Sequence, residues 1–192
     1  MMVSTHLVTG FFVGAGVVSF LHLNGLEAAL LLMGSTAGAL LPDVDHPKSW
    51  LGRRIRFVSV PVAAVFGHRG VTHSLLAVVG LAVLLRYGLA QWHLVDTRWG
   101  LVAVGVAVGY LSHILGDFVT HGGVPLLWPI KRRFSSPLTF LTGGIFERLL
   151  KVILVLGAVW ILLARFAPWT QDYARAMLRY LAALTAGVLA VF

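Results

Sequence analysis

The sequence predicts an all-α, polytopic membrane protein of about six transmembrane helices, with four as the lower limit. Hydrophobic residues make up 58% of the 192-residue chain and charged residues only 11%, and the mean hydropathy is +0.89. Soluble domains carry about 25% charged residues, so this composition is far too apolar for a soluble domain. The apolar residues also gather into runs that approach the ~20 residues needed to span a bilayer as a helix.

Six apolar runs define the expected helices in chain order. They are Leu7–Leu21, Leu26–Leu41, Ser74–Ala90, Trp99–Gly116, Leu149–Ala167 and Arg175–Phe192. Residues 1–10 contain no Lys or Arg, so the first run lacks the basic region of a signal peptide and we expect it to stay as a helix. Val58–Phe66, interrupted by Pro61, and Gly122–Pro129 are too short to span, and we expect them to lie at the interface or to re-enter.

The chain shows no repeat, low-complexity tract or linker, so we expect a single domain. The motifs described below fall within residues 4–150, and we expect residues 151–192 to add scaffold helices. Twenty-one glycines fit closely packed membrane helices, because small residues let backbones approach one another.

The basic residues act as a topology signal. The formal net charge is +8, but the Lys and Arg residues lie in short loops between apolar runs, so we expect no nucleic-acid partner. Six crossings place both termini and the loops 42–73 and 117–148 on one side of the membrane. That side holds ten basic residues against five on the other, and the positive-inside rule makes it cytoplasmic.

Most of the side chains that can bind a metal share this cytoplasmic side. They are His6, Asp43, Asp45, His46, His68, His73, His113, Asp117, His121 and Glu147. His22 and His93 fall at the opposite face. Since the chain has no cysteine, any metal site must use imidazole and carboxylate ligands. Ionisable groups at membrane depth are costly, so their collection at one face indicates a shared purpose.

The spacing His113-x3-Asp117-x3-His121 places three such side chains along one stripe of a helix. Four residues rotate by only ~40° around an α-helix, so the stripe can bind a metal. A hydrogen-bonded His–Asp pair at a helix end is an equal alternative. The helix is expected to end at Gly122-Gly123, which places His121 in its last turn.

The loop after the second apolar run supplies two carboxylates. Pro42 and Pro47 fix an extended or turning backbone, from which Asp43 and Asp45 project to the same side. Hard carboxylate oxygens at this spacing suit a divalent cation. A solvated turn is the alternative, and it is favoured when the loop is considered alone.

The segment Gly67–Ser74 opens the third expected helix, with Thr72 as its N-cap. His68 and His73 are five residues apart and do not share a helical face, so they converge on one site only through the glycine-flanked turn. Arg69 offers a planar fork of donors for a phosphate or carboxylate oxygen. A role for Arg69 as a topology arginine is at least as compatible with the sequence.

His6 precedes the first expected helix and Glu147 precedes the fifth, and each alone is more simply a polar helix terminus. Considered together, five or more imidazoles with three or four carboxylates exceed the needs of one tetrahedral zinc. They suit two metals with supporting partners. A metal pair favours phosphoester chemistry.

Four motifs, taken in order, resemble the YdjM-like family of LexA-regulated, membrane-bound, predicted metal-dependent hydrolases. They are Thr5-His6, Leu41–Pro47, His68–Ser74 and His113-x3-Asp117-x3-His121. The resemblance implies a helical inner-membrane protein with seven presumed metal ligands, namely His6, Asp43, Asp45, His68, His73, His113 and Asp117. His46 and His121 are interpreted as additional ligands or supporting groups. A further likeness to the zinc phospholipase C class, which also uses His-x3-Asp on a helix, favours a phosphoester substrate.

The first hypothesis is therefore a membrane-bound metal-dependent hydrolase that acts on a phosphoester or lipid-like substrate, such as a phospholipid, at the cytoplasmic face. We expect two divalent ions as cofactors, with zinc favoured and manganese or iron as alternatives. Arg69 is expected to stabilise developing negative charge, and Asp45 or Glu147 to move protons. The expected partners are membrane lipids and an amphiphilic or phosphorylated substrate, and the sequence leaves the oligomeric state open.

Two other hypotheses stay open. A metal-ion transporter would use the same residues to line an ion path, but it would spread ionisable groups through the membrane depth. A non-catalytic membrane scaffold with a structural metal site would lose its fold on metal removal and show no turnover.

Overall fold

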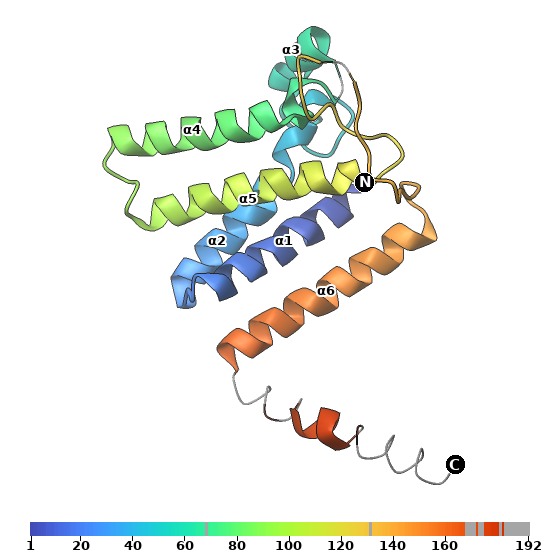
Figure 1. Cartoon of the computed structure of the whole chain (residues 1–192). Helices are drawn as coiled ribbons and strands as arrows, with labels where there is room; N and C mark the ends of the chain where they lie inside the picture. The colour runs from blue at the N-terminus through green and yellow to red at the C-terminus, as the bar shows by residue number, and fades with distance from the viewer. Residues whose placement is uncertain (68, 131, 168–171, 173–174, 181, 183–192) are drawn as a thin grey trace.

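The computed structural model describes the chain except residues 68, 131, 168–171, 173–174, 181 and 183–192 (Figure 1). The described residues form six α-helices, two short 3₁₀ helices and a further helical stretch at 175–180, with no β-strand among them beyond two isolated bridges. In chain order the elements are α1 (Val3–Phe20), α2 (Gly25–Gly38), η1 (Leu41–Asp45), α3 (Arg56–Phe66), η2 (Val71–His73), α4 (Leu75–Gln91), α5 (Arg98–Phe118) and α6 (Ile145–Phe166). This arrangement confirms the all-α prediction.

Four helical segments of the described chain are long and apolar enough to cross a membrane. They are α1, the continuous stretch Gly25–Asp45, α5 and α6. The apolar helix α4 is shorter, at 17 residues. The expected last helix, Arg175–Phe192, lies mostly outside the described residues. The chain is thus a helical membrane protein, and the helices that can be described meet the lower limit of the expected range.

Helices α2 and α5 pack so closely that glycine is required at their contact. A Cβ atom on Gly105 would collide with the Leu31 carbonyl oxygen, and one on Gly109 would collide with the Ser35 carbonyl oxygen. The Ser35 hydroxyl also donates a hydrogen bond of 2.6 Å to the Gly10 carbonyl oxygen on α1. In a bilayer, such close backbone approach replaces the hydrophobic effect as the source of helix association. It fixes the ends of α1, α2 and α5 relative to one another.

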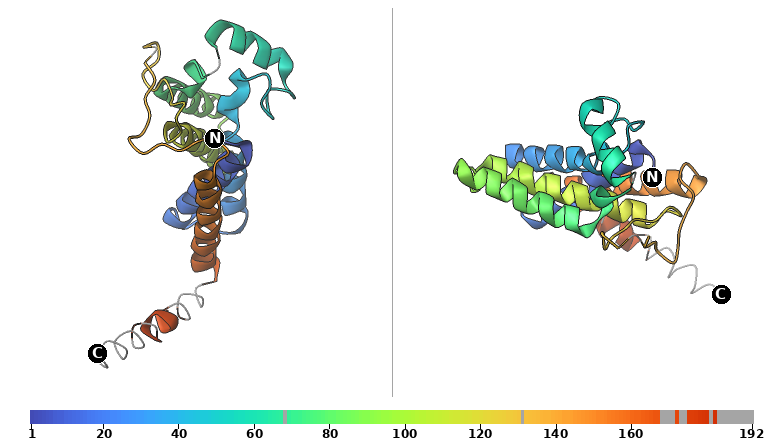
Figure 2. Two further views of the ribbon diagram at one scale, coloured as in Figure 1. Left: turned by 90° about the vertical axis from the view of Figure 1, so that its right-hand side faces the viewer. Right: turned by 90° about the horizontal axis from the view of Figure 1, so that it is seen from above.

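The start of α1, the end of α5 and the start of α6 lie at one end of the bundle (Figure 1). Helices α4 and α5 form an antiparallel hairpin, and α6 packs along α1 on the opposite side. Helix α3 sits at the same end and runs across the bundle instead of along it (Figure 2, right).

The described residues of the connection between α5 and α6 fold over this end and form no helix. The backbone N–H of Leu75 donates to the Leu126 carbonyl oxygen at 3.0 Å, which ties the connection to the start of α4. Val124 is fully buried and packs with Tyr110 and Ile114. Gly122–Pro129, expected to lie at the interface or to re-enter, is therefore a loop that packs on α4 and α5.

Candidate metal centre

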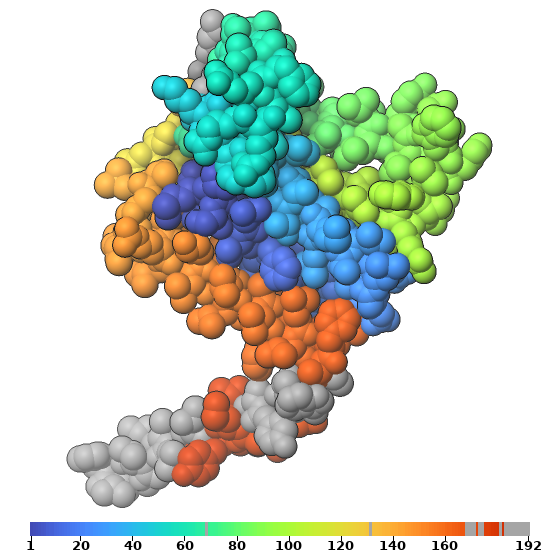
Figure 3. Space-filling view, turned by 180° about the vertical axis from the view of Figure 1, so that it is seen from behind, coloured from blue at the N-terminus to red at the C-terminus, as the bar shows by residue number. Residues whose placement is uncertain are grey.

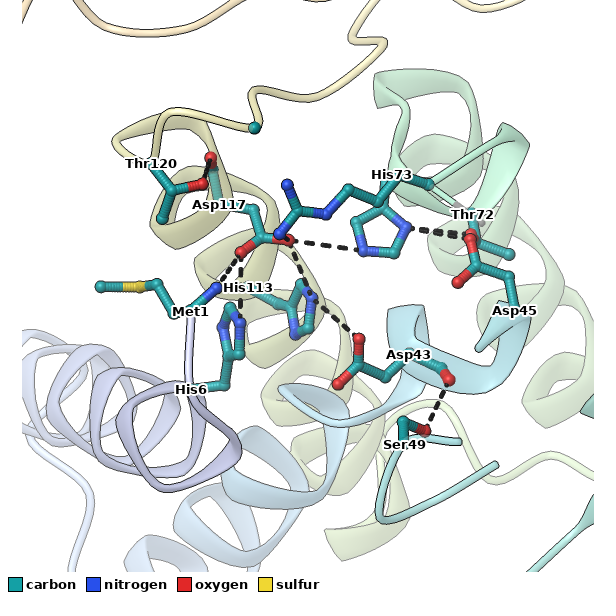
Figure 4. Close-up of polar contacts among 12 residues, drawn as sticks. Met1, His6, Asp43, Asp45, Ser49, Thr72, His73, His113, Asp117 and Thr120 are labelled. Carbon is teal, nitrogen blue, oxygen red and sulfur yellow. Dashed lines mark hydrogen bonds and ion pairs between the residues drawn. The ribbon is translucent and has the colours of Figure 1, made fainter. Parts of the chain in front are cut away.

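Five ionisable side chains from four elements converge at the end of the bundle where α1 begins and α5 ends (Figure 4). They form two groups of three that share His113, and within each group the ligand atoms lie within 4.8 Å of one another. The first group is His6, His113 and Asp117, and the second is Asp43, His73 and His113. All five residues were among the ligands expected from the sequence.

Helix α5 supplies the shared ligand and orients it through the backbone. Nδ1 of His113 lies 2.7 Å from the Ala39 carbonyl oxygen, so Nδ1 carries the proton and donates it. Nε2 then presents its lone pair to the centre, 3.8 Å from a carboxylate oxygen of Asp43 and 3.8 Å from one of Asp117. This Nε2 is buried and has no hydrogen-bond partner among the described residues. A buried acceptor of this kind suits a metal ion.

Asp117, one turn after His113, has nitrogen atoms of three residues close to its buried carboxylate. Its Oδ1 lies 2.5 Å from the α-amino group of Met1 and 3.4 Å from Nε2 of His6. Its Oδ2 lies 2.8 Å from the guanidinium of Arg69. The expected placement of His113 and Asp117 on one stripe of a helix agrees with this geometry.

His6 reaches the centre from the first turn of α1. The sequence had suggested a position before this helix. Its ring stacks on that of His113, with centroids 3.6 Å apart and planes within 8°. The stacking holds the His6 ring beside the His113 ring, and it points Nε2 of His6 at Asp117.

The second group is supported by Asp45, which lies behind His73 instead of facing the centre. The Asp45 carboxylate is fully buried and lies 3.1 Å from Nδ1 of His73. It also accepts a hydrogen bond from the hydroxyl of Thr72, whose carbonyl oxygen accepts one of 2.5 Å from Tyr110. A carboxylate on one ring nitrogen of a histidine directs the other nitrogen to a ligand site.

The expectation that Asp43 and Asp45 share one side was therefore wrong. The Leu41–Asp45 segment is a 3₁₀ helix and not an extended strand. Residues two apart in such a helix are separated by about 240°, so their side chains diverge. Asp43 joins a ligand group, whereas Asp45 belongs to neither.

Glu147 is also fully buried, and each of its carboxylate oxygens accepts a hydrogen bond from the backbone. One oxygen accepts the N–H of Met2 at 2.6 Å and the other accepts the N–H of Gly143 at 2.6 Å. It lies in the first turn of α6, whereas the sequence suggested a position before the helix. It belongs to neither ligand group. Its carboxylate joins the start of α6 to the start of α1 and so helps to position the amino-terminal residues.

The remaining expected ligands are not brought to the centre by the described structure. His68 lies outside the described residues. His46 follows η1 and is in neither ligand group. Helix α5 ends at Phe118, so His121 does not continue the stripe, and its side chain is exposed.

Three supporting contributions were missed from the sequence: the Ala39 carbonyl, the Thr72 hydroxyl and the Tyr110 hydroxyl. Thr72 was expected to cap the following helix, but Ser74 does so by accepting the N–H of Ala77 at 3.2 Å. The position of Thr72 directly before His73 was the available signal. Nothing in the sequence identifies a particular backbone carbonyl.

The donor set fits a divalent metal. Imidazole nitrogens and carboxylate oxygens bind Zn, Mn and Fe, and both His113 and His73 have the outer partner that metal-binding histidines require. The fold and the site thus define an integral, helical membrane protein with a buried cluster of histidines and aspartates at one membrane face.

The chain belongs to the YdjM inner membrane protein family, whose family model matches residues 1–191. It is 48% identical over 126 residues to the inner membrane protein YdjM of Escherichia coli (strain K12), and the match covers 63% of this chain and 61% of that protein. It is 31% identical to the uncharacterized protein YvsG of Bacillus subtilis (strain 168), over 81% of this chain and 91% of that protein. The inner membrane protein YbcI of Escherichia coli (strain K12) is 34% identical over 70% of this chain and 72% of its own length. No solved structure matches.

Proposed function

We propose that this inner membrane protein is a metal-dependent hydrolase that cleaves a phosphoester or lipid-like substrate at the cytoplasmic membrane face. The observation that carries the proposal is the pair of ligand groups that share His113. The five residues lie at one end of the helices and are not spread along them, which favours a site open to one membrane face over an ion path. The cytoplasmic assignment rests on the excess of Lys and Arg at this end.

Nε2 of His113 has a single lone pair, so it would bind one divalent ion, either with His6 and Asp117 or with Asp43 and His73. The two side chains of the other group would supply ligands for a second ion. Zinc is the favoured ion, with manganese or iron as alternatives. The chemistry supplied by such ions is polarisation of a phosphoryl oxygen and activation of water.

Side chains of the protein would stabilise the substrate's charge, accept protons and position the ligands. Arg69 is 16% exposed at its side chain and lies beside Asp117, so its guanidinium can contact both the centre and an incoming phosphate oxygen. Asp43 is the more exposed ligand carboxylate, at 17%, and is the better candidate to accept a proton from water. Asp45 and Glu147, expected to move protons, instead have oxygens that accept hydrogen bonds from the protein, and we assign them positioning roles.

The proposal is tested with zinc-loaded protein reconstituted into lipid nanodiscs, with hydrolysis of a panel of phospholipids and water-soluble phosphomonoesters followed by ³¹P NMR. We expect turnover that a chelator removes, zinc restores and His113→Ala abolishes. Loaded, folded protein that hydrolyses no member of the panel would contradict the hydrolase and support a structural metal site.

A further inference from the structure

Helix α3 has two faces, and the one turned away from the protein is apolar. The inner face packs on the protein through buried Ser59 and half-buried Val62 and Ala63. On the outer face Phe57 is 80% exposed and Val65 is 72% exposed. An 11-residue helix is too short to cross a bilayer, so these side chains belong to none of the membrane-spanning segments.

The position of α3 is that of a helix lying in the plane of a membrane surface. It sits at the same end of the bundle as the metal centre and runs across the direction of the spanning helices (Figure 2). On the face seen in Figure 3 it stands out from the body of the molecule. An amphipathic helix in this orientation buries its apolar face at the boundary between headgroups and acyl chains.

The turn that leads into α3 and the first residue of the helix carry a cluster of three exposed arginines, Arg53, Arg54 and Arg56. The guanidinium of Arg54 stacks on the ring of Trp50 at 3.7 Å. Arginine offers a planar fork of donors that matches a phosphate, and tryptophan prefers the headgroup level of a bilayer. The basic turn and the apolar face therefore suit two parts of the same partner.

We propose that α3 is a membrane-surface anchor that inserts Phe57 and Val65 among acyl chains and binds anionic phospholipid headgroups through Arg53, Arg54 and Arg56. The charge of the cluster is complementary to the negative surface of a leaflet rich in anionic lipid. A second protein chain would explain the apolar face, but it would not require the basic turn beside it.

A packing contact and two hydrogen bonds connect the anchor to the segment that carries Asp43. The N–H of Gly52, which lies against Ser59 of α3, donates to the Ser49 hydroxyl at 2.8 Å. That hydroxyl donates to the Asp43 carbonyl oxygen at 2.9 Å. Lipid bound at α3 would thus lie beside the segment that carries Asp43. The anchor itself does not depend on the proposed hydrolase activity.

Because the chain contains no cysteine, single-cysteine variants can report one position each. Spin labels are placed at Phe57→Cys and Val65→Cys in the full chain, reconstituted into phosphatidylcholine vesicles with and without phosphatidylglycerol. Val83→Cys, on the exposed apolar surface of α4, is the lipid reference, and Ser135→Cys, in an exposed loop, is the water reference. Accessibility to oxygen and to a nickel chelate gives the depth of each label.

We expect the labels at positions 57 and 65 to resemble the lipid reference and to lie deeper in vesicles that contain phosphatidylglycerol. Arg53→Gln/Arg56→Gln should remove this dependence on anionic lipid. Arg86→Gln/Arg98→Gln, which removes two exposed arginines near the end of α4 and the start of α5, should keep it.

Three results would overturn the proposal. Labels that resemble the water reference would show that α3 lies in solvent. Dipolar coupling between labels on different molecules would show that a second copy covers the helix. Equal depth in neutral and anionic vesicles would remove the headgroup-binding role of the arginines. None of these results depends on enzymatic turnover, so the proposed function could fail while the anchor holds.

Discussion

Asp45→Asn distinguishes a carboxylate that binds metal from one that orients a metal-binding histidine. The structure places Asp45 behind His73, at 3.1 Å from Nδ1, and outside both ligand groups. Asparagine keeps the shape of the side chain but weakens the charge-assisted hydrogen bond that directs Nε2 of His73 towards the centre. Loss of such an outer partner typically costs about 10–100-fold in metal affinity, or ~1.4–2.8 kcal/mol.

The assay is zinc affinity by competition with a chromogenic chelator, on detergent-purified protein with wild-type circular dichroism. Asp172→Asn, at an exposed ion pair with Arg175, is the control and should leave affinity unchanged. Thr72→Val removes a smaller part of the same support and should have a smaller effect. Unchanged affinity in Asp45→Asn would refute the orienting role, and loss of binding as complete as in Asp117→Ala would make Asp45 a direct ligand.

Three further predictions concern packing, the amino terminus and the arginine at the site. Gly109→Ala should lower the free energy of unfolding by about 1–3 kcal/mol or more, because the added Cβ would collide with the Ser35 carbonyl oxygen. The Cβ added in Gly80→Ala has no atom within contact distance, so this control should leave thermal unfolding in detergent unchanged. Glu147→Gln should lower the free energy of unfolding by about 1–3 kcal/mol, because an amide NH₂ then faces one of two backbone donors, whereas exposed Glu27→Gln should leave it unchanged. Equal thermal stability of the two variants would argue against a role for Glu147 in joining the start of α6 to the start of α1. Gly122→Ala should displace Arg69, because the guanidinium occupies the place of the added Cβ, and it should raise KM for a phosphoester about tenfold or more without loss of metal. Arg133→Gln is the control. An unchanged KM in Gly122→Ala would place Arg69 outside the substrate site.

The sequence was sufficient to predict the fold class and the relative positions of residues that lie on the same helix. Apolar runs identify membrane helices because lipid requires every backbone group to be satisfied within the segment. The pair His113 and Asp117 could be placed together because their spacing alone sets their relative direction in α5.

The roles of the other carboxylates could not be separated in this way. Asp43 and Asp45 differ in function only because their segment winds as a 3₁₀ helix, and that choice depends on packing against α3 and η2. Glu147 resembles a catalytic carboxylate in sequence, but the nearby N–H groups of Met2 and Gly143 make it a structural acceptor. The partner of His113 is a backbone carbonyl at Ala39, 74 residues away, and no side chain marks it.

The most direct test of the metal centre is the metal content of detergent-purified, tag-free protein, measured by elemental analysis after incubation with zinc and removal of excess ion. Wild type is compared with His113→Ala/Asp117→Ala and with His22→Ala/His93→Ala, which removes two exposed histidines outside the site. We predict about one to two equivalents of zinc per chain in wild type and in the control, and near-complete loss in the site variant. Well-folded wild type that retains no zinc, manganese or iron, or equal loss in both double variants, would contradict the metal centre.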